Sequence, residues 1–245
     1  MGIRAVLFDL DNTLTHRDQS VQAYSRNLYR HYQLHLANQA PVAQQTIESD
    51  HINVIEQIVN IVRRIDNGGY PKKELLTHGS IGASVAYALL QELSWANPPR
   101  LEELTEFWFS QFGAAAVAMT GAVEVLQKLK QQDYKLAVIS NGGHATRLNI
   151  IKGLGIFDYF DAIFSSESVG VAKPKAEIFL KVCSELQVEP EQSLYIGDHP
   201  INDYQGATQA GLNALLIEGF HALNEHPIPK DKIIQRLDQI FDHLS

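Results

Sequence analysis

Two aspartates stand almost side by side near the start of the chain, in the stretch VLFDLDNTLT from Val6 to Thr15. Asp9 and Asp11 follow a run of apolar residues, so a buried strand is predicted to deliver two carboxylates to one place. Like charges this close are unfavourable unless a cation or a shared proton compensates them. Carboxylates can ligate hard cations, attack electrophiles and move protons. The stretch therefore predicts a metal-assisted site, unless water solvates both side chains.

Other chemically capable residues follow later apolar runs. Ser140 and Asn141 stand in VISNGG, Lys173 in GVAKPK, and Asp198 and Asp203 in GDHPIND. Taken singly, each could be an ordinary turn or helix-cap residue. Their common place matters more, because each lies at a predicted strand end or in the loop beyond it. The carboxyl ends of parallel strands meet in one crevice, so these side chains are expected to gather there.

The pattern along the chain predicts an α/β fold with a doubly wound, parallel, Rossmann-like sheet and an inserted, all-helical cap. An apolar strand over 3–8 is followed by purely helical periodicity from about residue 16 to 118, and then by alternating helices and strands. The expected strands are 134–140, 162–165, 193–196 and 214–217, and the expected helices are 121–132, 144–154, 175–186, 203–210 and 230–243. The catalytic core is therefore predicted to comprise 1–15 and 119–245, and the cap 16–118.

Composition narrows the classes of protein. The 245 residues carry a net charge of -8, with 45% hydrophobic and 20% charged residues. A nucleic-acid binder would need a basic face, so nucleic acid is not an expected partner. No apolar run reaches the length of a membrane span, and a strand pattern begins at once without a signal peptide, so we expect a cytoplasmic location and no membrane partner. The single cysteine, Cys183, lies on the apolar face of a predicted helix and is interpreted as a packing residue.

The four motifs FDLDNTL, ISN, AKPK and GDHPIND together resemble the signature of the haloacid dehalogenase superfamily. The helical insert before TGAVEVLQKL resembles the C1-type cap of that superfamily. The resemblance extends from Ile3 to about Ile217. It implies a hydrolase core with a helical cap, acting on a small phosphorylated metabolite.

The resemblance also implies a role for each motif residue. Asp9 would be the nucleophile and Asp11 the general acid and base, while Lys173 would offset negative charge and bind substrate. The hydroxyl of Ser140 and the backbone N–H of Asn141 would hold phosphoryl oxygens.

A metal ion completes the implied site. Asp9, Asp198 and the backbone carbonyl of Asp11 would ligate Mg²⁺, a hard cation that oxygen ligands suit. Asp203 would orient this cluster without necessarily touching the ion.

The expected function is a Mg²⁺-dependent phosphatase that hydrolyses a small phosphomonoester through an aspartyl-phosphate intermediate. Asp11 is present here, whereas dehalogenases and phosphonate-cleaving members of the superfamily lack that second aspartate. The motif forms are most similar to nucleotidase-like and acylneuraminate-phosphatase-like branches, which favours a nucleoside monophosphate or a sugar phosphate. A sugar phosphomutase is the alternative, because it keeps the same residues. A non-catalytic binding module is disfavoured because such a module would have no need to keep Asp9, Asp11, Lys173 and Asp198 all intact.

Some other residues have the spacing or position of functional groups. His31 and His35 have the spacing of a zinc pair, but no third ligand follows in register, so a surface of the helical insert is favoured. His199 is interpreted as a loop residue bordering the site. The basic residues of the insert are interpreted as a solvated run that could reach a substrate: Arg63, Arg64, Lys72 and Lys73.

Overall fold

The computed structural model describes residues 2–37, 44–223 and 227–244, and divides into two compact units. The first comprises Met1–His16 and Ala118–Ser245, and the second comprises Arg17–Val117. Within the described residues, no helix is both long enough and apolar enough to cross a membrane.

The first unit contains a six-stranded sheet in which every neighbouring pair is parallel, so the predicted α/β class is confirmed. The order is β3-β2-β1-β4-β5-β6, and β1 therefore lies between β2 and β4. The chain winds outward from β1 in one direction and then in the other, so the strand order reverses between β1 and β4. In open α/β sheets, ligands bind at the carboxyl ends of the strands at such a reversal. The strands are β1 (Ala5–Phe8), β2 (Lys135–Ser140), β3 (Ala162–Ser165), β4 (Ser193–Gly197), β5 (Asn213–Ile217) and β6 (Ile233–Ile234).

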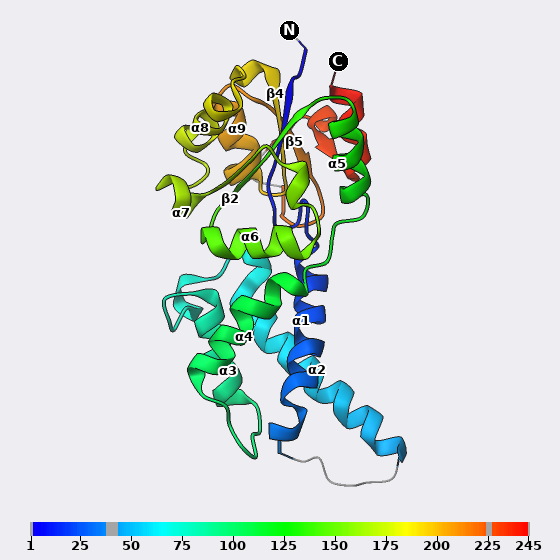
Figure 1. Ribbon diagram of the computed structural model, residues 1–245, viewed down its shortest axis with the longest axis vertical. Coiled ribbons are helices and arrows are strands. Elements are labelled where there is room, and N and C mark those ends of the chain that lie inside the picture. The colour runs from blue at the N-terminus through cyan, green and yellow to red at the C-terminus, as the bar shows by residue number, and fades with distance from the viewer. Residues whose placement is uncertain (1, 38–43, 224–226, 245) are drawn as a thin grey trace. The chain divides into compact units, whose positions relative to one another are not determined.

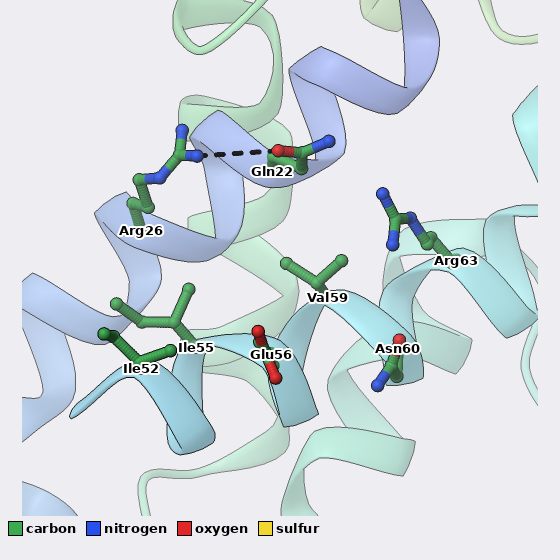
Figure 2. A pocket seen from close by; sticks show the side chains of 8 residues that line it. All are labelled: Gln22, Arg26, Ile52, Ile55, Glu56, Val59, Asn60 and Arg63. Atoms are coloured by element: carbon green, nitrogen blue, oxygen red, sulfur yellow. Dashed lines mark hydrogen bonds between the residues drawn. The ribbon is translucent and has the colours of Figure 1, made fainter. Parts of the chain in front are cut away.

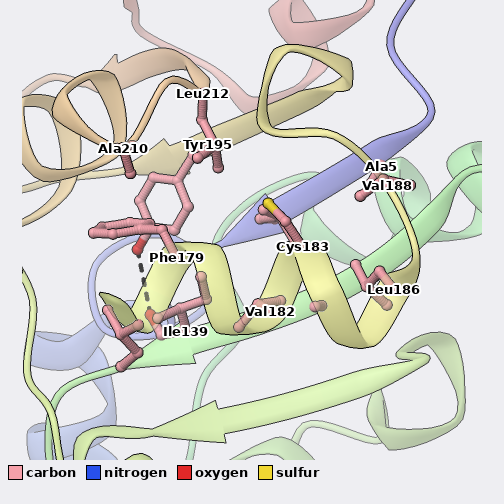
Figure 3. Packing of buried hydrophobic residues seen from close by; sticks show 14 of the residues in the cluster. Ala5, Ile139, Phe179, Val182, Cys183, Leu186, Val188, Tyr195, Ala210 and Leu212 are labelled. Carbon is pink, nitrogen blue, oxygen red and sulfur yellow. Dashed lines mark hydrogen bonds between the residues drawn. The ribbon is translucent and has the colours of Figure 1, made fainter. Parts of the chain in front are cut away.

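Helices cover both faces of the sheet: α8 and α9 lie on one side and α5 on the other (Figure 1). Alternate strand residues form the core beneath α8, where Phe179 packs edge-on against the ring of Tyr195 (Figure 3). Cys183 is buried in this cluster, which confirms its packing role. The helices of this unit are α5 (Ala122–Gln131), α6 (His144–Gly153), α7 (Ser166–Val169), α8 (Ala176–Leu186) and α9 (Gly206–Gln209).

The predicted C-terminal helix over 230–243 is wrong. The segment instead forms a 3₁₀ turn (Lys230–Lys232), strand β6 and a 3₁₀ helix (Leu237–His243). Ile233 and Ile234 pair with the end of β5, where β-branched side chains suit an extended backbone better than a helix. Tertiary pairing has overridden the helical periodicity here.

The helix predicted over 203–210 is displaced and divided. A π-helical segment, Pro200–Gln205, comes first and α9 continues from it. His199 caps this segment, because its Nδ1 accepts hydrogen bonds from the N–H groups of Ile201 and Asn202 at 3.1 and 3.2 Å. The earlier start follows from this cap and from Pro200, whose fixed φ suits the first helical turn.

The second unit contains four main helices and, among the residues described, no strand. A buried ion pair ties the start of α1 to the end of α2: Arg17 Nη2 lies 2.5 Å from Asp66 Oδ1, and the guanidinium also lies over the ring of Phe112. The break expected at Pro41 lies outside the described residues. The helices are α1 (Arg17–Tyr32), α2 (Gln44–Asp66), α3 (Ile81–Glu92) and α4 (Leu101–Ala114).

The predicted surface histidines contact neighbours within the helical unit. His35 Nδ1 lies 3.1 Å from the Asn97 carbonyl, and the ring of His31 packs against Phe107. Two basic residues also form ion pairs there, Arg63 with Asp18 and Arg64 with Glu92. A cavity of about 440 Å³ lies between α1 and α2 (Figure 2), lined by Gln22, Arg26, Ile52, Ile55, Glu56, Val59, Asn60 and Arg63.

Candidate active site

The pairing of β1 with β4 brings two of the predicted acids together. Phe8 is in register with Ile196, and the N–H of Asp9 donates to the Ile196 carbonyl at 2.8 Å. Asp9 and Asp198 therefore leave neighbouring strands at nearly the same level, and both are buried, with 3% and 1% exposed. Gly197 is necessary in this motif because a Cβ there would collide with the side chain of Asp203.

Lys173 lies at the centre of the buried cluster. Its ammonium lies 2.7 Å from Asp9 Oδ1, 2.6 Å from Asp203 Oδ1 and 2.9 Å from the Tyr195 hydroxyl, so all three protons are used. Burial alone would lower the pKa of this ammonium, but Asp203 and Asp9 outweigh burial and raise the pKa above its ordinary value. Lys173 is therefore a permanent positive charge.

Asn141 anchors the backbone of Lys173. Its Nδ2 donates to the Lys173 carbonyl at 3.1 Å, and its Oδ1 accepts from the Lys173 N–H at 2.9 Å. The two predicted motifs are thus joined by a double hydrogen bond between side chain and backbone. Ser140 is the buried last residue of β2, immediately before this anchor.

Asp203 is held from both sides. Its Oδ1 accepts from Lys173 and lies 3.0 Å from the Tyr195 hydroxyl, while its Oδ2 accepts from the His199 N–H at 2.9 Å. Carboxylate oxygens of Asp203, Asp9 and Asp198 lie within 4.8 Å of one another. The sequence prediction placed Asp203 as an orienting residue, and its hydrogen bonds suit that role.

Asp11 stands apart from this trio. Its Oδ2 lies 3.1 Å from Nη1 of Arg147, and both side chains are buried. The three carboxylates that converge are thus Asp9, Asp198 and Asp203, whereas the predicted metal set was Asp9, Asp11 and Asp198. The backbone carbonyl of Asp11, which the sequence analysis offered as a ligand, stays a prediction.

Sequence reasoning missed several residues of the site. Asn12 Nδ2 donates to Asp198 Oδ2 at 3.1 Å, and His221 Nε2 lies 3.2 Å from the same oxygen. The ring of His199 lies 4.5 Å from that of His221, so His199 borders the site as expected. Burial raises the pKa of Asp198, and His221 partly offsets this effect.

Charge balance shows that the residues fit a divalent cation. Four buried carboxylates (Asp9, Asp11, Asp198 and Asp203) face two buried cations, Lys173 and Arg147. The pKa of Asp9 is raised well above its ordinary value, chiefly by burial. Lys173 lowers this pKa and so partly compensates burial, whereas the other three carboxylates raise it further. Asp9 Oδ2 is buried without a hydrogen-bond partner among the described residues. An excess of two negative charges and an unpaired carboxylate oxygen are what a bound Mg²⁺ would satisfy.

This fold and this constellation of motifs match a known class of enzyme. A model of the haloacid dehalogenase-like hydrolases matches residues 3–211. The chain therefore belongs to the haloacid dehalogenase-like hydrolase family, as its motifs predicted.

Named relatives lie at moderate identity. Haloacid dehalogenase-like hydrolase domain-containing protein 3 of Mus musculus is 31% identical over 153 residues, which cover 61% of this chain and 60% of that protein. The protein of the same name from Homo sapiens is 31% identical over 130 residues, which cover 52% of this chain and 51% of that protein. The chain thus spans between half and three fifths of the length of these two relatives. Glyceraldehyde 3-phosphate phosphatase of Methanopyrus kandleri is 25% identical over 218 residues, covering 86% of this chain and 82% of that one.

Solved structures share the fold. The magnesium-bound putative HAD-hydrolase YfnB from Bacillus subtilis superposes with a TM-score of 0.63 at 21% identity, over 100% of both chains. A dehalogenase crystallised as an intermediate complex gives 0.66 at 18% identity, covering 99% of this chain and 97% of that one. At these identities, the structures support the architecture alone.

Proposed function

We propose that this protein is a Mg²⁺-dependent phosphatase that hydrolyses a small phosphomonoester through an aspartyl-phosphate formed on Asp9. The observation that carries the proposal is the state of the Asp9 carboxyl. Lys173 holds its Oδ1, while its Oδ2 has no hydrogen-bond partner in the described part of the chain. A buried carboxylate fixed by one oxygen and uncommitted at the other is arranged to attack phosphorus or to ligate a cation.

The reaction proceeds in two displacements at phosphorus. Asp9 attacks the phosphoryl group, the ester P–O bond breaks, and the leaving oxygen takes a proton from Asp11. Water then attacks the acyl phosphate and gives a proton to Asp11, and the bond from Asp9 to phosphorus breaks, releasing inorganic phosphate. The Ser140 hydroxyl and the Asn141 N–H hold the phosphoryl oxygens during both steps, while the fixed positive charge of Lys173 offsets the negative charge of the phosphoryl group.

Asp9 and Asp198 would hold the Mg²⁺ ion. When bound, Mg²⁺ supplies positive charge that offsets the carboxylates and the phosphoryl group. Asp203 keeps Asp9 and Lys173 in place through their shared hydrogen bonds.

The substrate is a nucleoside monophosphate or a sugar phosphate, as the motif forms suggest. The 25% identity to a glyceraldehyde 3-phosphate phosphatase supports adding triose phosphates to the same panel. We assign the choice of ester to the helical unit, following the resemblance to a C1-type cap. Substitution of the exposed Lys72 and Lys73 by alanine should then change the preferred ester and leave hydrolysis of p-nitrophenyl phosphate nearly unchanged.

Phosphate release tests the proposal. The protein is incubated with Mg²⁺ and a panel of phosphorylated metabolites, and both inorganic phosphate and the ester are measured. Free phosphate supports the phosphatase, an isomerised ester supports a mutase, and an unchanged panel supports a binding module. Asp9→Asn should abolish turnover because an amide forms no acyl phosphate, whereas the exposed Asp158→Asn is the matched control.

A further inference from the structure

One buried guanidinium connects two parts of the site. Arg147 lies in the first turn of α6, is 6% exposed, and places Nη1 3.1 Å from Asp11 Oδ2. Its Nε donates to the Asn141 carbonyl at 3.1 Å, and its Nη2 donates to the same carbonyl. Arg147 therefore bridges the loop after β1 and the loop after β2.

The chain makes room for this bridge at Gly142. The φ of Gly142 is +132°, and a Cβ there would lie 2.5 Å from Arg147 Nη2. Only glycine adopts this conformation readily and also leaves the space that the guanidinium occupies. The local backbone is thus shaped around the arginine side chain.

The anchor of Arg147 is itself rigid. The Asn141 side chain is locked to the backbone of Lys173 by two hydrogen bonds. A guanidinium held at that carbonyl presents its remaining N–H groups to Asp11 in a fixed direction, because its donors form a planar fork. Asn141, which anchors the backbone of Lys173, consequently also orients Asp11 through Arg147.

We propose that Arg147 is a positioning residue that holds the Asp11 carboxyl in the orientation required for its proton transfers. This inference rests on the proposed phosphatase function. Arg147 acts through Asp11, and its contribution therefore depends on how much the leaving group needs a proton. An alkoxide leaving group needs one, whereas p-nitrophenolate leaves without it.

Comparing esters with different leaving groups distinguishes this positioning role from a merely structural one. kcat/KM reports formation of the aspartyl-phosphate, whereas kcat also includes its hydrolysis. Arg147→Gln should lower kcat/KM for an alkyl phosphate by about 10- to 100-fold, part of the usual contribution of positioned proton transfer. For p-nitrophenyl phosphate kcat/KM should change less than about threefold while kcat falls, because Asp11 still serves as base in the second step.

The experiment compares both esters in the full-length protein with Mg²⁺. Arg147→Gln and Arg147→Lys are measured beside Lys152→Gln, which removes an exposed charge from the same helix. Lysine cannot contact Asp11 and the Asn141 carbonyl as a fork, so Arg147→Lys should show a smaller loss of kcat/KM, and this loss should be confined to the alkyl ester. Circular dichroism checks folding, and Arg147→Lys decides the question where Arg147→Gln does not fold.

A double variant completes the test. In an Asp11→Asn background, Arg147→Gln should cost less than about threefold further on the alkyl ester, because residues acting as a unit are not additive. Equal losses of kcat/KM on both esters would overturn the inference. So would a loss in the Asp11→Asn background as large as the loss that Arg147→Gln causes alone. Failure of the wild-type protein to release phosphate from either ester would instead refute the proposed function.

Discussion

The ammonium of Lys173 lies 2.7 Å from Asp9 Oδ1 and is shared with Asp203, whose Oδ1 lies 2.6 Å away. The Tyr195 hydroxyl accepts the third hydrogen bond of this ammonium. One cation thus compensates two buried carboxylates that come from the segments following different strands, Asp9 after β1 and Asp203 after β4. Because no proton of Lys173 remains uncommitted in this arrangement, its fixed charge is the property on which the site depends.

Replacing Lys173 by methionine should damage both turnover and stability. The change keeps the apolar stem but leaves Asp9 and Asp203 facing each other without a counter-ion. Removing one partner of a buried ion pair costs about 3–5 kcal/mol of folding free energy. Urea unfolding and phosphate release should both show large losses, and every ester should be affected alike. Wild-type turnover by a stable Lys173→Met variant would contradict this role.

Asp11→Asn should separate the two chemical steps. The variant keeps the shape of the side chain but can neither protonate the leaving group nor activate water. Turnover should fall by about 10²–10⁴-fold. With p-nitrophenyl phosphate, whose leaving group needs no proton, phosphorylated Asp9 should accumulate. Mass spectrometry of the acid-quenched reaction measures this adduct, and an unphosphorylated protein at every time point would refute the two-step mechanism.

Mg²⁺ should stabilise the protein through Asp198. A ligand that binds only the native state raises the unfolding temperature by mass action. The wild-type Tm is expected to rise with Mg²⁺ concentration, and the rise should be lost in Asp198→Asn because a carboxylate ligand is gone. Asp158→Asn is the matched control. An equal Mg²⁺-dependent shift in Asp198→Asn would remove Asp198 from the metal site.

The core of the fold could be predicted because its signals are local. Apolar runs mark the inner strands, and β3 was predicted at 162–165, where the structure has Ala162–Ser165. The C-terminal segment was not predictable in this way, because Ile233 and Ile234 form a strand only through pairing with β5. Such an interaction joins distant segments and leaves little trace in local periodicity.

The residues of the site divide in the same way, into those marked by local sequence motifs and those brought in by contacts between distant segments. Residues in recognisable motifs were found, and Asp9, Lys173, Asp198 and Asp203 do lie together. Two partners of the motif residues, Tyr195 and Arg147, were missed because nothing in their own sequence neighbourhood marks them. Tyr195 lies within a buried strand and Arg147 within a helix, so both look like ordinary members of those elements. His221 lies in the segment that follows β5, and this place beyond a strand end is the sequence signal that could have indicated it.

Two ion pairs of the helical unit should differ sharply in their effect on stability. The Arg17–Asp66 pair is buried, with side chains 3% and 1% exposed, whereas both side chains of the Arg63–Asp18 pair are 45% exposed. Asp66→Ala should lower the free energy of unfolding by about 3–5 kcal/mol, because Arg17 stays buried without its carboxylate. Asp18→Ala should cost less than about 1 kcal/mol, as expected for an exposed pair. Urea unfolding measures both, and similar losses would contradict the burial argument.

The thiol of Cys183 should remain protonated in the native protein under mildly alkaline conditions. Burial raises its pKa, and the contact of Sγ with Ser193 Oγ at 3.6 Å only partly opposes this effect. Because the thiolate is the nucleophile, Ellman's reagent should react slowly with native protein and rapidly with protein unfolded in guanidinium.

The raised pKa of Cys183 also determines the direction in which the free energy of unfolding changes with pH. Where the native pKa of a group exceeds its unfolded value, the unfolded chain loses the proton first as pH rises. The contribution of Cys183 is therefore fully present below the ordinary thiol pKa of 9.0 and is lost as pH rises through the higher native value. Cys183→Ala removes this titration and packs a small apolar group in the same place. Above pH 9.0, the free energy of unfolding should consequently fall less steeply in Cys183→Ala than in the wild type. Identical slopes, measured by urea unfolding across this range, would show that the thiol ionises equally well in the folded core.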